Sequence, residues 1–266
     1  MKAWKKMLLA AGVMLCSNMA LAQRPVIAII IDDLGNNAKD ERAVNLPGAI
    51  ACAFLPHAPY TKSLARKAHS QNKEVVLHAP MESLHGHAMG PGSLTLHMTE
   101  KQFISTLQED LASVPHVQGI NNHMGSLLTR HPGHMLWLMQ EMNRHGGLFF
   151  VDSRTTLGSV AQTVAAENSI PNLDRDVFLD AEPGAEFVEQ QFDRLIKIAQ
   201  TRGAALAIAH PYPATIKVLK QRLKQLDNIG VDLVPVSTLI QRKQQELPAW
   251  QLSSSHLPKV AKNSKP

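Results

Sequence analysis

Short runs of consecutive apolar residues alternate with amphipathic stretches along most of this chain. Because the runs are continuous rather than alternately apolar and polar, they are typical of parallel strands that are covered on both faces. We expect eight such strands, at residues 26–31, 50–55, 75–77, 117–120, 148–151, 177–179, 205–209 and 231–234.

Several of the intervening segments have the spacing of helices. Apolar residues fall on one face of residues 61–72, and Thr99 with Gln102 has the pattern of a capping box at the start of another helix. Further helices are expected at residues 132–144 and 184–201. Strands that alternate with helices predict an α/β protein, either a barrel of the (β/α)₇ or (β/α)₈ kind or, failing that, an open doubly wound sheet.

The first 22 residues have the pattern of a secretory signal peptide. Three lysines come first, and the apolar stretch from Met7 to Leu15 is shorter than the roughly 20 residues that a membrane-spanning helix needs. Ala20-Leu21-Ala22 then provides a small-x-small cleavage site. We expect a mature protein that begins at Gln23, is periplasmic or secreted, and is not held in a membrane after cleavage. An uncleaved membrane anchor is the alternative.

The rest of the chain divides into one large domain and a short tail. Residues 23–245 form the predicted β/α domain, and residues 246–266, rich in Ser, Pro and Lys, are predicted to be disordered. The signal peptide carries Cys16, so the mature chain keeps only Cys52 and has no intramolecular disulfide. Cys52 lies in an apolar run, where we expect a buried thiol.

Composition excludes some classes of protein. With 44% hydrophobic and 18% charged residues, the chain can bury a core, which argues against a disordered protein. The formal charge of +5 includes three lysines of the signal peptide, so the mature domain is close to neutral. Aromatic residues make up only 5%, too few for a base-stacking platform. No nucleic-acid partner is expected, and the sequence does not predict an oligomeric state.

Polar residues follow most of the predicted strands. In β/α folds the functional groups gather at the carboxyl ends of the strands, so these residues are expected on one rim. They are Asp32-Asp33, His78, Asn121-Asn122-His123, Asp152, Asp180 and His210. We interpret residues 119–126 as an irregular polar segment after a strand. The loop from Met81 to Met98 is rich in His and Gly and is expected to cover the site.

This set of residues fits a zinc hydrolase. One carboxylate and two imidazoles, with open positions for water, form a familiar hydrolytic zinc arrangement, and Asp33, His78 and His123 are candidates for these ligands. Asp32 is then the candidate base and His210 the candidate acid. Glu82, four residues after His78, is an alternative ligand. The residues alone therefore predict metal-assisted hydrolysis, with zinc the favoured divalent ion.

Six segments together resemble the divergent polysaccharide deacetylase family of bacterial envelope proteins. In chain order they are Ile29-Ile30-Ile31-Asp32-Asp33-Leu34-Gly35, Leu77-His78-Ala79-Pro80-Met81, residues 119–126, Phe150-Val151-Asp152-Ser153, residues 175–180 and Ala209-His210-Pro211-Tyr212-Pro213. The likeness covers residues 25–243. It implies a single distorted (β/α)₇-type barrel and a place beside the polysaccharide deacetylase superfamily, whose members remove acetyl groups from sugars.

The resemblance also implies roles for individual residues. The Thr-Phe-Asp-Asp motif of the superfamily supplies a base and a metal ligand, which fall on Asp32 and Asp33. In the His-Ser-x-x-His motif, His78 matches the first histidine, whereas Glu82 stands at the second. Asn121 to Gly125 replaces the Arg-x-Pro-Tyr motif, so that His123 takes the place of the missing ligand. The Leu-x-His motif is matched in part by residues 208–210, with His210 as the acid.

Three functions remain open from the sequence. The first is a secreted, metal-dependent deacetylase that removes acetyl groups from a glycan, with an acetylated carbohydrate as its substrate. The second is a non-catalytic relative that binds a glycan or an envelope partner through the same cleft. The third is another metallohydrolase, such as a phosphoesterase.

Overall fold

The computed structural model describes residues 23–246. The predicted signal peptide, residues 1–22, and the predicted tail beyond residue 246 lie outside the described residues. Nine strands occur in this part of the chain: β1 (Val26–Leu34), β2 (Ala51–Phe54), β3 (Val75–Met81), β4 (Val117–Met124), β5 (Phe149–Asp152), β6 (Asn172–Asp174), β7 (Val177–Phe178), β8 (Ala204–Ala209) and β9 (Asp232–Leu233). The α-helices are α1 (Glu41–Val44), α2 (Thr61–Ser70), α3 (Glu100–Ser113), α4 (Pro132–His145), α5 (Ala161–Glu167), α6 (Ala185–Arg202), α7 (Pro213–Arg222) and α8 (Val236–Glu246).

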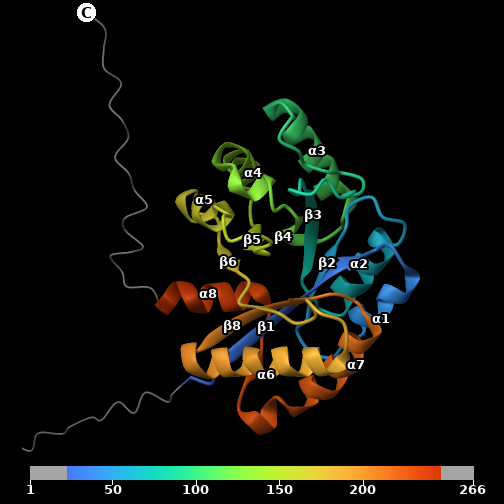
Figure 1. Cartoon of the computed structure of the whole chain (residues 1–266), viewed down its shortest axis with the longest axis vertical. Helices are drawn as coiled ribbons and strands as arrows, with labels where there is room; N and C mark the ends of the chain where they lie inside the picture. Colours follow the sequence, from blue (N-terminus) through green and yellow to red (C-terminus); the bar gives the residue numbers. More distant parts are fainter. Residues whose placement is uncertain (1–22, 247–266) are drawn as a thin grey trace, which may run out of the picture.

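The strands form one parallel sheet that curls into a half-barrel (Figure 1). Its order is β6-β5-β4-β3-β2-β1-β8-β7, and β9 also pairs with β1. The path of paired strands ends at β6 and at β7, and the ladders of the described residues do not join these two ends. The predicted fold class, an α/β protein with a distorted barrel of the (β/α)₇ type, is confirmed.

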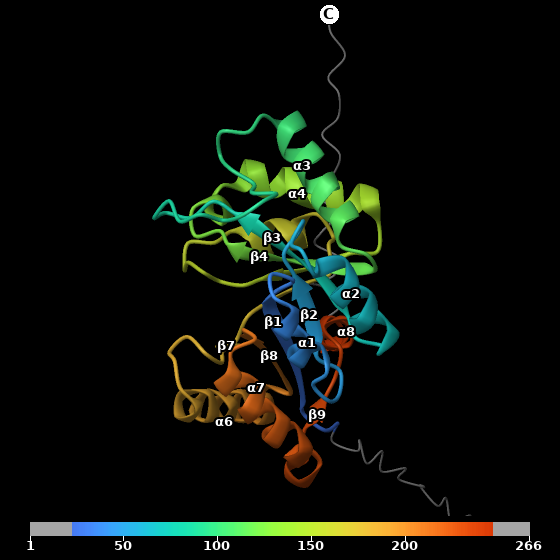
Figure 2. The ribbon, with the colours of Figure 1, turned by 90° about the vertical axis from the view of Figure 1, so that its right-hand side faces the viewer.

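Helices cover the outer face of the sheet in two groups. Figures 1 and 2 show α3, α4 and α5 together on the side of β3 to β6, and α6 with α7 on the opposite side, where α6 packs on β8. The last helix, α8, packs instead against β1 and β8. Its Val236, Leu239 and Ile240 belong to the inner apolar cluster. This helix therefore covers the amino ends of the central strands.

Alternation along the strands separates an inner and an outer core. In β1, Ala28 and Ile30 belong to the inner cluster, whereas Ile27 and Ile29 pack with the surrounding helices. Successive strand side chains point to opposite faces of a sheet, so each strand carries one series of residues into the barrel. The inner series is apolar along most of its length and becomes polar near the carboxyl ends. The candidate site lies where this inner series becomes polar.

The structure departs from the predicted elements mainly at strand ends. Residues 121–124 are not irregular, because β4 continues to Met124 and pairs with β3 residue for residue from Val76 opposite Gly119 to Met81 opposite Met124. The sequence pattern also missed β6, α1, α5, α7 and α8. The thiol of Cys52 is buried as expected, and burial raises its pKa to about 12. None of the helices in residues 23–246 has the length and apolar character needed to cross a membrane.

Candidate metal centre and active site

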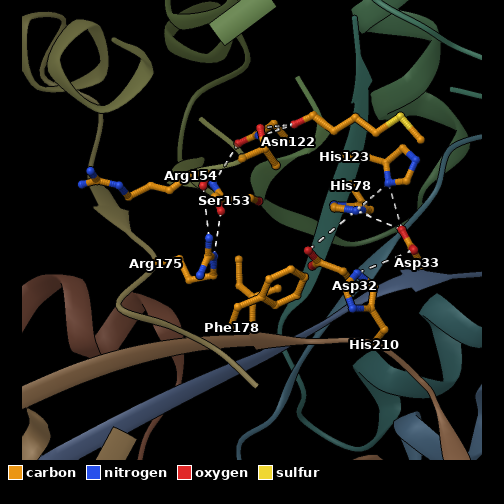
Figure 3. Close-up of a pocket in the computed structure, with 13 residues that line it drawn as sticks. Asp32, Asp33, His78, Asn122, His123, Ser153, Arg154, Arg175, Phe178 and His210 are labelled. Atoms are coloured by element: carbon orange, nitrogen blue, oxygen red, sulfur yellow. Dashed lines mark hydrogen bonds and ion pairs between the residues drawn. The ribbon is translucent and has the colours of Figure 1, made fainter. Parts of the chain in front are cut away.

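A cavity of about 390 Å³ opens at the carboxyl ends of the strands (Figure 3). The lining residues come from both halves of the curled sheet and from the connections that follow β5 and β6. They are Asp32, Asp33, His78, Asn122, His123, Met124, Ser153, Arg154, Thr155, Arg175, Phe178, Ile208 and His210. All five residues that the sequence predicts for the site therefore line one cavity.

Strand alternation explains why these residues meet. Asp32 lies two positions beyond Ile30 in the inner series of β1, and His78 lies two beyond Val76 in that of β3. His210 has the same relation to Ile208, directly after β8. Asp33 would be expected to face outward, but its φ of 59° and an irregularity in the pairing of β1 with β2 break the alternation there. Both aspartates of the pair consequently reach the cavity.

Asp33, His78 and His123 form a group that is suited to hold a divalent ion. Their ligand atoms lie within 4.8 Å of one another. Asp33 Oδ1 is 2.9 Å from His123 Nδ1 and 3.2 Å from His78 Nε2, and the two ring nitrogens are 3.1 Å apart. Tetrahedral zinc with bonds of about 2.0–2.1 Å separates its ligand atoms by about 3.3 Å. The three atoms are thus already close to the spacing that zinc requires.

The bonding of Asp33 supports the same assignment. Asp33 Oδ1 is buried but meets no hydrogen-bond donor of suitable geometry among the described residues. Burial acts to raise the pKa of this carboxyl, yet His123 and His78 hold it well below its usual range. The carboxylate is therefore ionised, and a buried oxygen without a donor is costly unless a cation completes it. One carboxylate and two imidazoles fit a zinc site.

The same two aspartates affect His78. Burial acts to lower the pKa of this imidazole, but Asp32 and Asp33 raise it to about 9. A cation bound at the three ligand atoms would take the place of the proton that these carboxylates favour.

Asp32 is buried directly beside this group. Its Oδ1 accepts a hydrogen bond from Asn121 Nδ2 at 2.8 Å, and its Oδ2 is 3.7 Å from His78 Nε2. Burial raises the pKa of Asp32, although His78 and His210 oppose that effect. A carboxylate with a raised pKa takes up protons more readily, which suits a general base.

His210 faces the pair from the other half of the sheet. Its Nε2 lies 3.8 Å from Asp33 Oδ2, and its Nδ1 lies 3.0 Å from Asp180 Oδ1. The other oxygen of Asp180 accepts from the backbone N–H of His210 and from the hydroxyl of Thr215. Burial acts to lower the pKa of His210, but Asp180 raises it. Asp180 therefore fixes the ring and favours its protonated form.

The opposite wall of the cavity is apolar and basic. Phe178 and Ile208 line it, and the guanidinium of Arg175 lies over the ring of Phe178 at 4.8 Å from its centroid. Arg175 Nε and Nη2 donate to the carbonyl oxygens of Ser153 and Arg154 at 2.8 and 3.1 Å. These bonds connect the segment between β6 and β7 to the end of β5. The cavity thus has an acidic side and an apolar side that a small acyl group could occupy.

Glu82, the alternative ligand, lies outside this group. Its carboxylate accepts a hydrogen bond from the backbone N–H of Leu96 at 2.7 Å, and the bridge between Met81 and Leu94 fixes the same loop beside β3. The prediction that residues 81–98 cover the site is also wrong, since none of them lines the cavity. The hydrogen bonds of Glu82 and Pro80 to this loop explain its position.

The sequence pattern did not distinguish every rim residue correctly. Asp152 does not line the cavity, because its carboxylate accepts bonds from Arg154 N–H and the Ser159 hydroxyl. Conversely, Asn121 and Asp180 contact the candidate base and acid, roles that their position after a strand could not specify. Their place in the inner series, two residues after Gly119 and Phe178, is the sequence feature that could have indicated them.

Comparisons with known proteins place the chain among deacetylase relatives. A family model described as divergent polysaccharide deacetylase matches residues 29–240. The uncharacterized protein YibQ of Escherichia coli K12 is 34% identical over 241 residues, which is 90% of this chain and 74% of that protein.

Solved structures show the same fold. An uncharacterized protein of Agrobacterium tumefaciens C58 aligns with a TM-score of 0.79 at 23% identity, covering 83% of this chain and 91% of its own. The catalytic domain of a peptidoglycan N-acetylglucosamine deacetylase from Eubacterium rectale aligns with a TM-score of 0.52 at 15% identity, covering 81% and 90%. From the family match over most of its length, this chain belongs to the divergent polysaccharide deacetylase family.

Proposed function

We propose that the protein is a divalent-metal-dependent deacetylase that removes acetyl groups from a carbohydrate. The observation that carries the proposal is the convergence of a ligand group, a buried carboxylate and a carboxylate-bound imidazole on one cavity. Family membership adds support, because the family model that matches this chain is described as divergent polysaccharide deacetylase. Zinc is the proposed ion, since the ligand atoms are one carboxylate oxygen and two imidazole nitrogens.

In this proposal Asp33, His78 and His123 would hold the ion. When bound, a divalent ion polarises an acyl oxygen and lowers the pKa of water. Asp32 is buried, and its Oδ1 accepts from Asn121 Nδ2 at 2.8 Å. In this proposal its carboxylate takes the proton of the attacking water. The water oxygen forms a bond to the acetyl carbon, and the bond from that carbon to the sugar nitrogen or oxygen then breaks.

His210 completes the reaction by giving a proton to the leaving sugar atom. Its Nδ1 is bonded to Asp180, so its Nε2 faces the cavity and Asp33. The raised pKa of His210 keeps the imidazolium available as the acid. Acetate and the free amine or hydroxyl of the sugar are the products. Phe178 and Ile208 offer an apolar surface for the acetyl methyl group.

An assay of acetate release tests the proposal. The chain from Gln23 is loaded with zinc, its metal content is measured, and acetate is quantified with N-acetylated and O-acetylated oligosaccharides. Replacing His210 with Ala should reduce turnover by about 10²–10⁴-fold, the usual contribution of an acid or base. Glu82→Gln is the control, because the Glu82 carboxylate accepts from the backbone N–H of Leu96 and does not line the cavity. Zinc and glycan binding without acetate release would instead favour the non-catalytic alternative.

We also propose that the protein is exported to the periplasm. The proposal is based on the lysine-rich start, short apolar core and Ala20-Leu21-Ala22 site of residues 1–22. Mass spectrometry of the protein recovered from a periplasmic extract should give an amino terminus at Gln23. A retained Met1 in membrane fractions would contradict export by cleavage.

A further inference from the structure

The carboxamide of Asn121 joins the candidate metal centre to the candidate base. It is fully buried in β4, opposite His78 in the pairing of β3 with β4. We propose that Asn121 is a positioning residue that holds His78 with its Nε2 lone pair toward the metal position and holds Asp32 in place at the same time. The proposal rests on the proposed function, because it assumes the metal centre of Asp33, His78 and His123.

The hydrogen-bonding pattern determines how the amide is oriented. Asn121 Nδ2 donates to Asp32 Oδ1 at 2.8 Å, as expected where the carboxylate acts as a base and accepts hydrogen bonds. The amide nitrogen must therefore face Asp32, which leaves Asn121 Oδ1 facing His78 Nδ1 at 2.9 Å. A carbonyl oxygen also only accepts, so Nδ1 of His78 must carry the hydrogen.

This hydrogen determines which ring nitrogen can bind a metal. A neutral imidazole carries one N–H, so a hydrogen on Nδ1 leaves a lone pair on Nε2. His78 Nε2 is the atom that lies 3.2 Å from Asp33 Oδ1 and 3.1 Å from His123 Nδ1. Metal-binding histidines generally donate their other N–H to such a partner, which fixes the ring and its tautomer. Asn121 serves as that partner.

The reversed amide would be strongly disfavoured. It would place Asn121 Oδ1 against Asp32 Oδ1, two acceptors at 2.8 Å in a site without exposure to solvent. The same amide atom lies 3.4 Å from the hydroxyl of Ser153, and a hydrogen bond of that length would be too weak to offset the repulsion between the two acceptors. A buried acceptor left without a donor is costly. The orientation of His78 is therefore coupled to the presence of the Asp32 carboxylate.

The neighbouring Asn122 provides a structural contrast within the same strand. It is equally buried, but its Nδ2 donates to the carbonyl of Met124 and its Oδ1 accepts from the backbone N–H of Ser153. Both partners of Asn122 are backbone groups, whereas Asn121 contacts the side chains of Asp32, His78 and Ser153, all of which line the cavity. Loss of Asn122 should therefore lower the stability of the β4 end without releasing the ring of His78.

Zinc affinity and the ring proton of His78 test the proposal. Titration calorimetry with Zn²⁺ should give an affinity about 10–100-fold weaker for Asn121→Ala than for the unchanged chain, the usual effect of losing such a partner. Asn122→Ala should stay within about threefold in zinc affinity. In the zinc-loaded protein, ¹H–¹⁵N correlations of the imidazoles should show a slowly exchanging hydrogen on His78 Nδ1 that Asn121→Ala loses.

A second variant separates the two contacts of the amide. Asn121→Asp keeps an acceptor for His78 Nδ1 but places a carboxylate against Asp32, so zinc binding should be retained while kcat falls with KM unchanged. A His78 bound to zinc through Nδ1, or equal zinc affinity in Asn121→Ala, would overturn the inference even if acetate is released. If Asn121→Ala does not fold, the ¹H–¹⁵N correlation of the zinc-loaded unchanged chain still tests the inference, because a missing hydrogen on His78 Nδ1 would overturn it.

The outcomes also separate this inference from the proposed function. Weaker zinc binding in Asn121→Ala, together with no acetate release by the unchanged chain, would retain the positioning role and reject the deacetylase. If the unchanged chain binds no zinc, both proposals fail.

Discussion

The two ends of the half-barrel bury charged side chains in opposite ways. At the amino end, Lys73 donates to the carbonyls of Leu46 and Gly48, and the carboxylate of Glu74 accepts from the N–H groups of Val236 and Ser237 at the start of α8. Each buried charge there is matched by backbone groups. At the carboxyl end, Asp32, Asp33, His78, His123 and His210 face one another across a cavity.

The buried charges of the two ends differ in their partners. Those at the amino end bind backbone groups and stabilise the fold, whereas those at the carboxyl end have only partial partners. Backbone partners are fixed by the strands and helices, so the charged groups of Lys73 and Glu74 have hydrogen-bond partners in the folded protein. The rim side chains are only partly satisfied by one another, and Asp33 Oδ1 meets no suitable donor in the described chain. Buried charges without complete partners are expensive, which is why we propose the rim as the place where a cation binds.

The largest effect is expected from removing the candidate base. Asp32→Asn should reduce acetate release by about 10³-fold or more, since proton transfer by a positioned group contributes about 10²–10⁴-fold. Zinc content should be unchanged, because Asp33, His78 and His123 remain and the carbonyl oxygen of the new Asn side chain can still accept from Asn121 Nδ2. Parallel measurement of metal content and turnover checks this. Loss of zinc in this variant would contradict the division of roles between Asp32 and the three proposed ligands.

Removal of a proposed ligand should affect binding as well as turnover. His123→Ala takes away one of the three ligand atoms of the group, and we expect zinc affinity to fall by at least about 100-fold, beyond the loss typical of an indirect partner. His97→Ala, a loop histidine outside the cavity, is the control. Full zinc affinity in His123→Ala would mean that another group completes the site.

The amino end should respond in the opposite sense. Glu74→Ala leaves the N–H groups of Val236 and Ser237 without their acceptor, and bonds to charged groups are worth about 1.5–3 kcal/mol. We expect the free energy of unfolding in urea to fall by about 2 kcal/mol. Zinc affinity should not change, since Glu74 lies at the other end of the strands. Lower zinc affinity in Glu74→Ala with an unchanged free energy of unfolding would contradict the distinction between the two ends.

A buried carboxyl outside both ends should give a smaller, pH-dependent effect. Asp110 in α3 is fully buried, its Oδ2 has no partner among the described residues, and burial, with Glu109 adding, raises its pKa to about 8. The folded state then binds more protons than the unfolded state between about pH 4 and pH 8, so stability falls as pH rises through this range.

Asp110→Asn should remove this dependence. Urea unfolding at pH 5 and pH 8 should show a loss at the higher pH that is larger in the unchanged chain by at least about 1.4 kcal/mol, the value of one pKa unit. Glu167→Gln, which removes an exposed carboxylate, should behave like the unchanged chain. Identical pH profiles in Asp110→Asn and the unchanged chain would show that Asp110 ionises normally. The contact of the Asp110 carboxylate that the structure shows is with His57, whose Nε2 lies 2.9 Å from Asp110 Oδ1.

The sequence by itself determined the fold class and the residue types of the candidate site. Consecutive apolar residues such as Ile27 to Ile31 require cover on both faces of a sheet, and that requirement selects parallel strands with helices between them. Carboxylates and imidazoles directly after such buried runs are costly unless they share a function at the strand ends. Asp32, Asp33, His78, His123 and His210 could be named for this reason.

Only the tertiary structure decided which polar groups meet. The curl of the sheet brings Asn121 of β4 within 2.8 Å of Asp32 of β1, although 89 positions separate them in the chain. The extension of β4 past Ile120 directs His123 into the cavity, while the hydrogen bond to Leu96 keeps Glu82 out of it. Spacing along a sequence fixes the face on which a side chain lies, but the distance between residues of different strands depends on sheet curvature and register, which arise from packing of the whole barrel.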